Sequence, residues 1–162
     1  MKNIIIVLSS FLILMYMGCN KESEFGDQPI VNADDLLTTT IQLEVSEFNN
    51  IYGELAIAIF NNENSFDSEN QTYQDSTLTV TDSGMIVLIE NIEPGNYAIS
   101  IFHDEDEDGV ITFGGFLNLV PQEGFGFSNN PSITMSQPNY SDCEFNIEEG
   151  QTLIVPIELV YL

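Results

Sequence analysis

Apolar and polar residues alternate along most of the chain between residue 39 and the C-terminus. This period-two pattern is typical of strands that bury one face, and no segment there sustains the 3.6-residue apolar spacing of an amphipathic helix. Seven strands are predicted, at residues 41–45, 55–59, 78–80, 86–90, 97–102, 143–147 and 153–161. We therefore expect an all-β domain, a single antiparallel β-sandwich of about seven strands that is transthyretin- or immunoglobulin-like.

Two segments fall outside this pattern. Residues 63–75 are rich in Asn, Ser and acidic side chains, so a loop is predicted there. Residues 104–141 form a long irregular excursion, and a loop of that length in a compact domain is usually functional. Among the strands, Ile86 and Leu88 mark the one at 86–90, and Pro156 in the last strand indicates an edge or a bulge.

The first 38 residues lack this strand pattern and consist of an apolar segment followed by an acidic one. After Lys2, residues 4–16 are apolar except for two serines, a run too short for a spanning helix of about 20 residues but typical of a signal peptide. A glycine then stands directly before Cys19, as in the lipobox of bacterial lipoproteins, which this segment resembles. We predict a signal peptide over 1–18 and an acidic tether over 19–38, followed by the β-sandwich domain over 39–162. Alternatives are an ordinary cleaved signal or an uncleaved anchor.

Lipid on Cys19 is the predicted attachment to a membrane. Lys21 followed by acidic residues resembles the surface-export signal of Bacteroidota lipoproteins. We therefore expect an outer-membrane lipoprotein of the cell envelope, facing either the cell surface or the periplasm.

Charge narrows the classes of function. The chain has 26 Asp and Glu against two Lys and Arg, and those two are Lys2 and Lys21. Nucleic acid is excluded as a partner because neutralising its phosphates requires the Lys and Arg that the domain lacks. Anionic lipid would repel the domain for the same reason, whereas divalent cations suit it.

The segment from His103 to Ile111 reads HDEDEDGVI and carries the first candidate site. Asp104, Asp106 and Asp108 occupy positions 1, 3 and 5 of a DxDxDG loop, and the carbonyl of Val110 stands at position 7. Alternate carboxylates converge when such a loop curls, and hard oxygen ligands in this number suit Ca²⁺ better than Mg²⁺. The spacing predicts a calcium loop on a β scaffold.

This loop departs from an EF-hand in two ways. Position 12 is Gly115 instead of a bidentate Glu, and no helices are predicted on either side. Glu123 is the expected source of a further carboxylate ligand. Without it, the dissociation constant for Ca²⁺ moves toward about 10⁻⁴–10⁻³ M. The alternative is a solvated acidic turn that binds no metal.

His103 is the only histidine of the chain. It is expected either to anchor the loop as a hydrogen-bonded imidazole or to act beside the aspartates as a ligand or proton carrier. A single histidine cannot form a histidine cluster, so a zinc hydrolase site is not expected.

A second motif spans residues 121–131 and reads PQEGFGFSNNP. Phe125 and Phe127 are predicted either to plug one end of the sandwich or to form a ligand-binding rim, and the absence of Trp favours the plug. Ser128 as a nucleophile would require His103 as its base, and no nucleophile elbow surrounds it. If Cys19 carries lipid, Cys143 is a lone thiol, expected to be buried in a strand; otherwise a disulfide between the two is possible.

Together these motifs resemble the bacterial domain-of-unknown-function family 2141. The matching segments are Gly53–Phe60 (GELAIAIF), Pro94–Ala98 (PGNYA), His103–Gly109 (HDEDEDG) and Glu123–Ser128 (EGFGFS). The resemblance covers about residues 40–162 and implies an exported β-sandwich without an established activity. Here Asp replaces the family's usual Asn in the loop, which strengthens a cation site. Thr112 stands where the family often has another Asp, which removes a possible ligand.

Three functions follow as hypotheses. The first is a non-catalytic binding or structural module of the envelope, stabilised by Ca²⁺, that contacts a protein or a glycan through residues 104–141. The alternative is a hydrolase that uses His103 with Asp104 or Glu123 as acid and base. A purely structural spacer is the third possibility.

Overall fold

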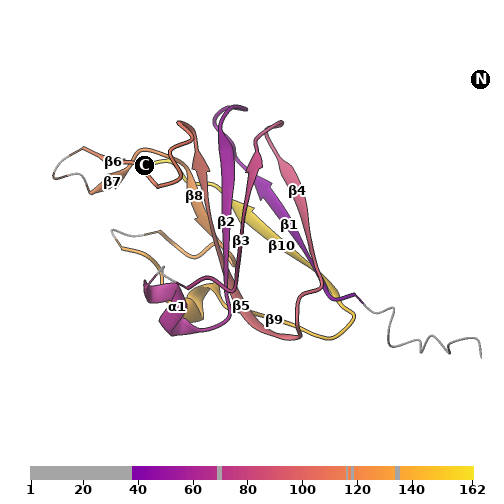
Figure 1. The fold of residues 1–162 in the computed structure, drawn as a ribbon. Coiled ribbons are helices and arrows are strands. Elements are labelled where there is room, and N and C mark those ends of the chain that lie inside the picture. The colour runs from indigo at the N-terminus through magenta and orange to yellow at the C-terminus, as the bar shows by residue number, and fades with distance from the viewer. Residues whose placement is uncertain (1–37, 69–70, 116, 118, 134–135) are drawn as a thin grey trace, which may run out of the picture. The chain divides into compact units, whose positions relative to one another are not determined.

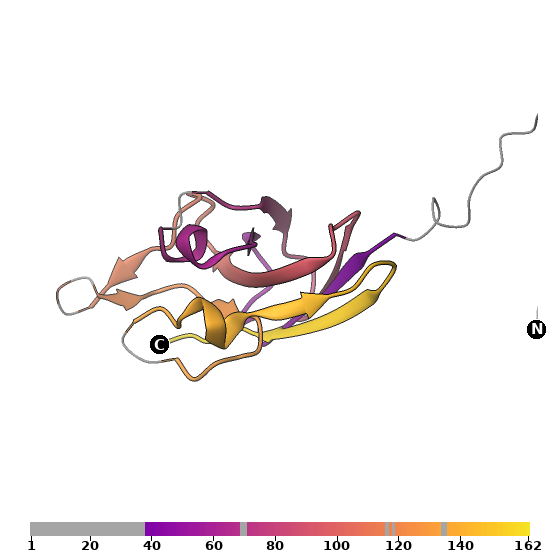
Figure 2. The ribbon, with the colours of Figure 1, turned by 90° about the horizontal axis from the view of Figure 1, so that it is seen from below.

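Two β-sheets packed face to face form the domain (Figures 1 and 2). The computed structural model describes residues 38–68, 71–115, 117, 119–133 and 136–162. The predicted signal peptide, Cys19 and the tether up to residue 37 lie outside the described residues. Among the described residues, no helix is long and apolar enough to cross a membrane.

The first sheet has three strands in the order β10 (Thr152–Glu158), β1 (Thr40–Ser46) and β4 (Met85–Glu90). β1 is its central strand and runs antiparallel to β4 but parallel to β10. Alternation in β1 buries Ile41, Leu43 and Val45 completely or nearly so, and turns the residues between them toward the outer face.

The second sheet has the order β3 (Gln74–Thr79), β2 (Glu54–Phe60), β5 (Gly95–Asp104) and β8 (Phe125–Phe127). The short β9 (Phe145–Ile147) pairs with the beginning of β5, while β8 pairs with its later part. β6 (Phe113–Gly114) and β7 (Val120–Pro121) form a separate small hairpin. In Figure 1 this hairpin projects from the same end of the sandwich at which β5 ends.

The main core lies between the two sheets and consists of aliphatic residues from the inner face of each, with Phe48 and Tyr97 at its margins. A second, smaller cluster lies on the outer face of β5, where α1 (Glu63–Ser68) and α2 (Tyr140–Cys143) pack. Phe66 of α1 is fully buried there and meets the rings of Phe60 and Tyr140 edge-on, with centroids 5.2 and 5.8 Å away. Both faces of β5 are therefore buried.

The all-β, sandwich-like class predicted from the sequence is confirmed, and each of the seven predicted strands is present. Pairing is antiparallel except between β1 and β10. The long excursion is not wholly irregular, because β6, β7 and β8 lie within it. The segment around Phe125 and Phe127 is thus a strand hydrogen-bonded to β5, and the prediction of a plug over one end was wrong.

Three local predictions also need correction. Residues 63–68, predicted as loop, form α1, whose first turn is capped when the Asn62 side-chain oxygen accepts from the Ser65 amide at 3.0 Å. In β4 the markers Ile86 and Leu88 face outward, 67% and 58% exposed, while Ile89 is buried. Cys143 is buried as predicted, but it lies in α2 and not in a strand.

Burial of the free thiol of Cys143 predicts a loss of stability at alkaline pH. Desolvation, with a smaller effect of Asp142, raises its pKa from 9.0 to about 12. Between these two values the unfolded chain releases a proton that the folded chain retains, so the free energy of unfolding falls as pH rises from about 9 toward 12. Burial also raises the pKa of Tyr140 and Tyr161, which acts in the same direction.

Urea unfolding at a series of pH values between 8 and about 11 measures this effect. Cys143→Val removes the ionisable thiol and is expected to give a shallower decline with pH. An equal decline in both proteins would exclude Cys143 as a cause.

Candidate functional site

The acidic loop begins where β5 ends. The register between β2 and β5 places Glu54 opposite Asp104, so the first residues of the acidic loop lie beside the turn that precedes β2. Gly53 in that turn has φ +76°, and a Cβ there would collide with the backbone of Asp104 and Glu105. A glycine is therefore required for the two segments to approach this closely.

Carboxylates of Asp104, Asp106 and Asp108 lie within 4.8 Å of one another. Asp104 is 1% exposed, and its two oxygens accept from the amides of Asp108 at 3.2 Å and Gly109 at 2.8 Å. The other two aspartates are exposed, and Oδ1 of Asp108 accepts from the amide of Val110 at 2.9 Å. The loop thus curls around the buried carboxylate of Asp104 and gathers the alternate carboxylates predicted from their spacing.

Two residues of this loop adopt left-handed backbone conformations, Glu107 with φ 60° and Gly109 with φ 80°. The glycine adopts its conformation without the steric cost of a Cβ, which agrees with its position at the bend. The described residues include no Lys or Arg, so no ammonium or guanidinium group offsets the carboxylates here. Oxygen ligands and uncompensated negative charge are the features that hard divalent cations require.

Glu123 has a different place from the one predicted. It is 4% exposed, and its two carboxylate oxygens accept from the amides of Glu105 at 2.9 Å and Thr112 at 2.8 Å. Among the described residues, the group whose carboxylates converge contains the three aspartates and not Glu123. Its contacts join the beginning and the end of the acidic loop, which makes it a support of the loop.

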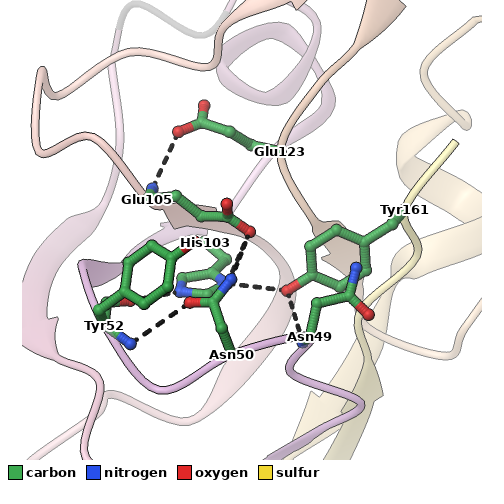
Figure 3. Close-up of polar contacts among 7 residues, drawn as sticks. All are labelled: Asn49, Asn50, Tyr52, His103, Glu105, Glu123 and Tyr161. Atoms are coloured by element: carbon green, nitrogen blue, oxygen red, sulfur yellow. Dashed lines mark hydrogen bonds and ion pairs between the residues drawn. The ribbon is translucent and has the colours of Figure 1, made fainter.

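His103 is fully buried, and both of its ring nitrogens have partners (Figure 3). Nε2 lies 2.7 Å from the carbonyl oxygen of Tyr52, which can only accept, so Nε2 carries a proton and donates. Nδ1 lies 2.8 Å from the hydroxyl of Tyr161 and 3.6 Å from a carboxylate oxygen of Glu105. The imidazole therefore joins the β1–β2 connection, β5 and the C-terminal residues, and its hydrogen bonds are made outside the acidic loop.

Tyr161 completes this network. Its hydroxyl accepts from the amide of Asn49 at 3.2 Å and lies 2.8 Å from Nδ1 of His103. Burial raises the pKa of Tyr161, and the charge of Glu105 adds to the effect, so the phenol remains a donor. Asn50 donates to Glu105 at 3.0 Å from the same connection (Figure 3).

Sequence reasoning did not predict Asn49, Asn50, Tyr52 or Tyr161 as parts of this site. Tyr161 is 58 residues from His103, and Asn50 is 55 residues from Glu105. Their residue types occur throughout the chain, so no local pattern distinguishes them. The one available indication in the sequence was Gly53, which matches a glycine of the family motif. Its left-handed conformation lets the turn before β2 approach Asp104 and Glu105.

Residues of the Gly-Phe motif have structural contacts. Phe125 and Phe127 are half-buried, with ring centroids 6.2 Å apart, and Phe127 also meets Phe66 at 6.1 Å. Ser128 is fully buried, and its hydroxyl donates to the carbonyl of Cys143 at 2.6 Å while accepting from the amide of Ile99 at 2.9 Å. Ser128 therefore joins β5 to α2 and lies apart from the His103 network.

One protein family matches the chain over residues 43–155, from within β1 to within β10. It is described as "Uncharacterized protein conserved in bacteria (DUF2141)". The chain belongs to this family. No curated protein and no solved structure matches the chain significantly. The DUF2141 match includes the acidic loop, His103 and Ser128, whereas Tyr161 lies beyond its last matched residue.

Proposed function

We propose that this DUF2141 protein is a non-catalytic module of the cell envelope whose acidic loop binds a calcium ion. The observation that carries the proposal is the convergence of three aspartate carboxylates within 4.8 Å, in a part of the chain that has no Lys or Arg. Bringing like charges this close is unfavourable unless they are solvated or bound to a cation. A divalent cation would offset the repulsion directly.

Asp104, Asp106, Asp108 and the carbonyl of Val110 are the proposed ligands. Ca²⁺ takes six to eight oxygens, and these four residues supply four of them when each carboxylate binds through one oxygen. Water or an external oxygen ligand would complete the shell. The predicted dissociation constant is therefore about 10⁻⁴–10⁻³ M, in the range of weak extracellular sites.

Calcium is expected to raise the thermal unfolding midpoint of the protein. A ligand that binds only the folded state stabilises it by RT ln(1 + [L]/Kd), which is about 1–3 kcal/mol at about 10 mM Ca²⁺ for this range of Kd. For a domain of this size the midpoint should rise by about 4–10 °C. Differential scanning calorimetry with and without Ca²⁺ measures the shift.

Asp106→Asn is the sharpest variant for this test. Asp106 is exposed and makes no hydrogen bond within the described residues, so its replacement removes a ligand charge without disturbing the loop. The calcium-dependent shift should become smaller in Asp106→Asn, whose amide oxygen is an uncharged and weaker ligand, and should persist in full in Glu107→Gln, a control in the same loop. An unchanged midpoint of the unsubstituted protein at about 10 mM Ca²⁺ would refute the proposal.

We also propose that the protein is attached to the outer membrane by lipid on Cys19. Support comes from the apolar segment at residues 4–16, the small residue before the cysteine and the acidic charge of the domain. Millimolar Ca²⁺ is available outside the cytoplasm, which suits a weak site. Intact-mass spectrometry of the protein extracted from membranes should show a diacylglyceryl adduct that is lost in Cys19→Ser; an unmodified mass would exclude it.

A further inference from the structure

The β6–β7 hairpin carries large apolar side chains that the rest of the described domain does not cover. Phe113, Leu117 and Leu119 are 48%, 72% and 64% exposed, and Val110, just before the hairpin, is 61% exposed. The hairpin projects from the sandwich in both views of the ribbon (Figures 1 and 2). Residues 109–122 contain no charged side chain, although 26 residues of the chain are acidic. An uncharged apolar projection on so acidic a chain indicates a contact surface.

The backbone of Leu117 indicates that its side chain serves a contact outside the fold. Leu117 lies in the turn of the hairpin with φ 61°, a left-handed conformation that glycine, asparagine and aspartate adopt far more readily than leucine. Gly115 in the same turn, with φ 69°, is the residue type expected there. Leucine adds backbone strain at this position and, because it is exposed, offsets little of that strain by burial within the domain.

Glu123 fixes the hairpin to the acidic loop. Its buried carboxylate accepts from the amides of Glu105 and Thr112, and the amide of Gln122 donates to the carbonyl of Thr112 at 2.9 Å. The base of the hairpin is therefore bonded to the beginning of the loop. Val110 belongs to both segments, because its carbonyl is a proposed calcium ligand and its side chain is one of the exposed apolar group. A surface that contacts the hairpin would thus lie beside the proposed calcium site.

We propose that the hairpin docks into the surface of a phospholipid bilayer, and that calcium at the acidic loop joins the domain to the lipid phosphates. Leu117 and Leu119 enter the boundary between headgroups and acyl chains, where apolar side chains of surface-bound segments are buried. The inference rests on the proposed calcium site, whose four protein ligands leave coordination positions for further oxygens. Phosphate oxygens of the lipid occupy these positions.

The proposed lipid attachment and the length of the tether favour a bilayer over other partners. Residues 19–38 join Cys19 to the domain, and a segment of this length spans at most about 70 Å. This reach exceeds the length of β1, about 23 Å, so a domain attached at Cys19 can bring its hairpin to the same membrane. Attachment also keeps the hairpin at a high effective concentration near that surface, which allows an individually weak contact to form.

Charge makes the docking dependent on calcium. Asp104, Asp106 and Asp108 repel lipid phosphates, and the described residues include no Lys or Arg that would offset this repulsion. One bound Ca²⁺ offsets most of the charge of the three carboxylates and attracts phosphate oxygens directly. A protein partner with basic side chains would instead bind the acidic loop best without calcium, because the cation would compete with it.

Tryptophan fluorescence tests the docking, because the chain contains no Trp. Full-length protein carrying Leu119→Trp is combined with vesicles of phosphatidylethanolamine and phosphatidylglycerol whose acyl chains are brominated, which quench an indole only at the depth of the bilayer. Relative to the same vesicles without bromine, emission is expected to fall at least about twofold when about 10 mM Ca²⁺ is added. Ile154→Trp, at an exposed position on β10, is the matched control and should not be quenched.

Leu117→Asn separates docking from a role in the fold. Asparagine tolerates the left-handed turn, so the unfolding midpoint should stay equal or rise, while the calcium-dependent quenching of the Leu119→Trp reporter falls at least about threefold. A lower midpoint with unchanged quenching would show that Leu117 serves the fold alone and would overturn the proposal.

Calorimetry of the same samples distinguishes failure of the docking from failure of the calcium site. A calcium-dependent rise of the unfolding midpoint without quenching would support the calcium site and overturn the docking, leaving a protein as the partner of the hairpin. Equal quenching with and without Ca²⁺ would also overturn the proposal, because the cation would then join nothing to the lipid. Absence of both responses would overturn calcium binding and docking together.

Discussion

Replacement of Glu123 by alanine is expected to lower the free energy of unfolding by about 3–5 kcal/mol, because hydrogen bonds to a charged group contribute about 1.5–3 kcal/mol each and two would be lost. Its carboxylate accepts from the amides of Glu105 and Thr112, at opposite ends of the acidic loop. Both amides lose their acceptor in the variant. Equilibrium unfolding in urea measures the difference.

Glu123→Gln distinguishes the two contributions of this side chain. The amide retains one acceptor oxygen, but its NH₂ group would face a backbone amide that also donates, so most of the destabilisation should remain. Glu149→Ala, at an exposed position, is the control and should change stability little. Hydrogen exchange of residues 105–112 should increase selectively in Glu123→Ala. Stability equal to that of the unsubstituted protein would show that water replaces these contacts.

His103→Ala is expected to destabilise the fold by a similar amount, about 3–5 kcal/mol, through a buried cavity and two lost hydrogen bonds. The variant leaves the carbonyl of Tyr52 and the hydroxyl of Tyr161 without their partner. Phe48, which meets the imidazole edge-on at a centroid distance of 5.2 Å, would border the cavity. Thermal and urea unfolding both report the loss.

Tyr161→Phe provides a graded comparison, since it removes one of the two hydrogen bonds and no ring; a loss of about 1–2 kcal/mol is expected. The same variants test the hydrolase hypothesis. A proton-transferring histidine needs a nitrogen accessible to substrate, whereas both nitrogens here are bonded and the side chain is fully buried. A His103→Ala protein that folds normally and loses a measurable hydrolytic activity would contradict the structural role.

Strand prediction succeeded where one face of a strand is polar. In β1 the alternation of Ile41, Leu43 and Val45 with polar residues determines both the strand and its buried face. β4 is apolar on both faces, so the pattern located the strand but could not choose between Ile86 and Ile89 as the buried position. α1 is six residues long, too short for helical periodicity to be visible, and Phe66 is its one buried apolar residue.

The same distinction applies to the site. The three aspartates are two residues apart, so a local property of the loop brings them together and the sequence could predict it. Glu123 was assigned as a ligand from its charge and its distance along the chain, yet its oxygens bond backbone amides that no sequence pattern marks. The partners of His103 come from the β1–β2 connection and the C-terminus, and only the sheet register places them there.

The central position of β1 has a mechanical consequence. Its first residue is the residue of the sheet closest in sequence to Cys19, the proposed lipid attachment. β1 is about 23 Å long at the usual rise of a strand, and the connection that follows it contacts the acidic loop through Asn50 and Glu105. Tension between a tethered N-terminus and a ligand held at the loop would act along β1. This tension would load the hydrogen-bonded ladders that join β1 to β10 and to β4 in shear. The thirteen residue pairs of the two ladders would then resist together, instead of separating one pair at a time.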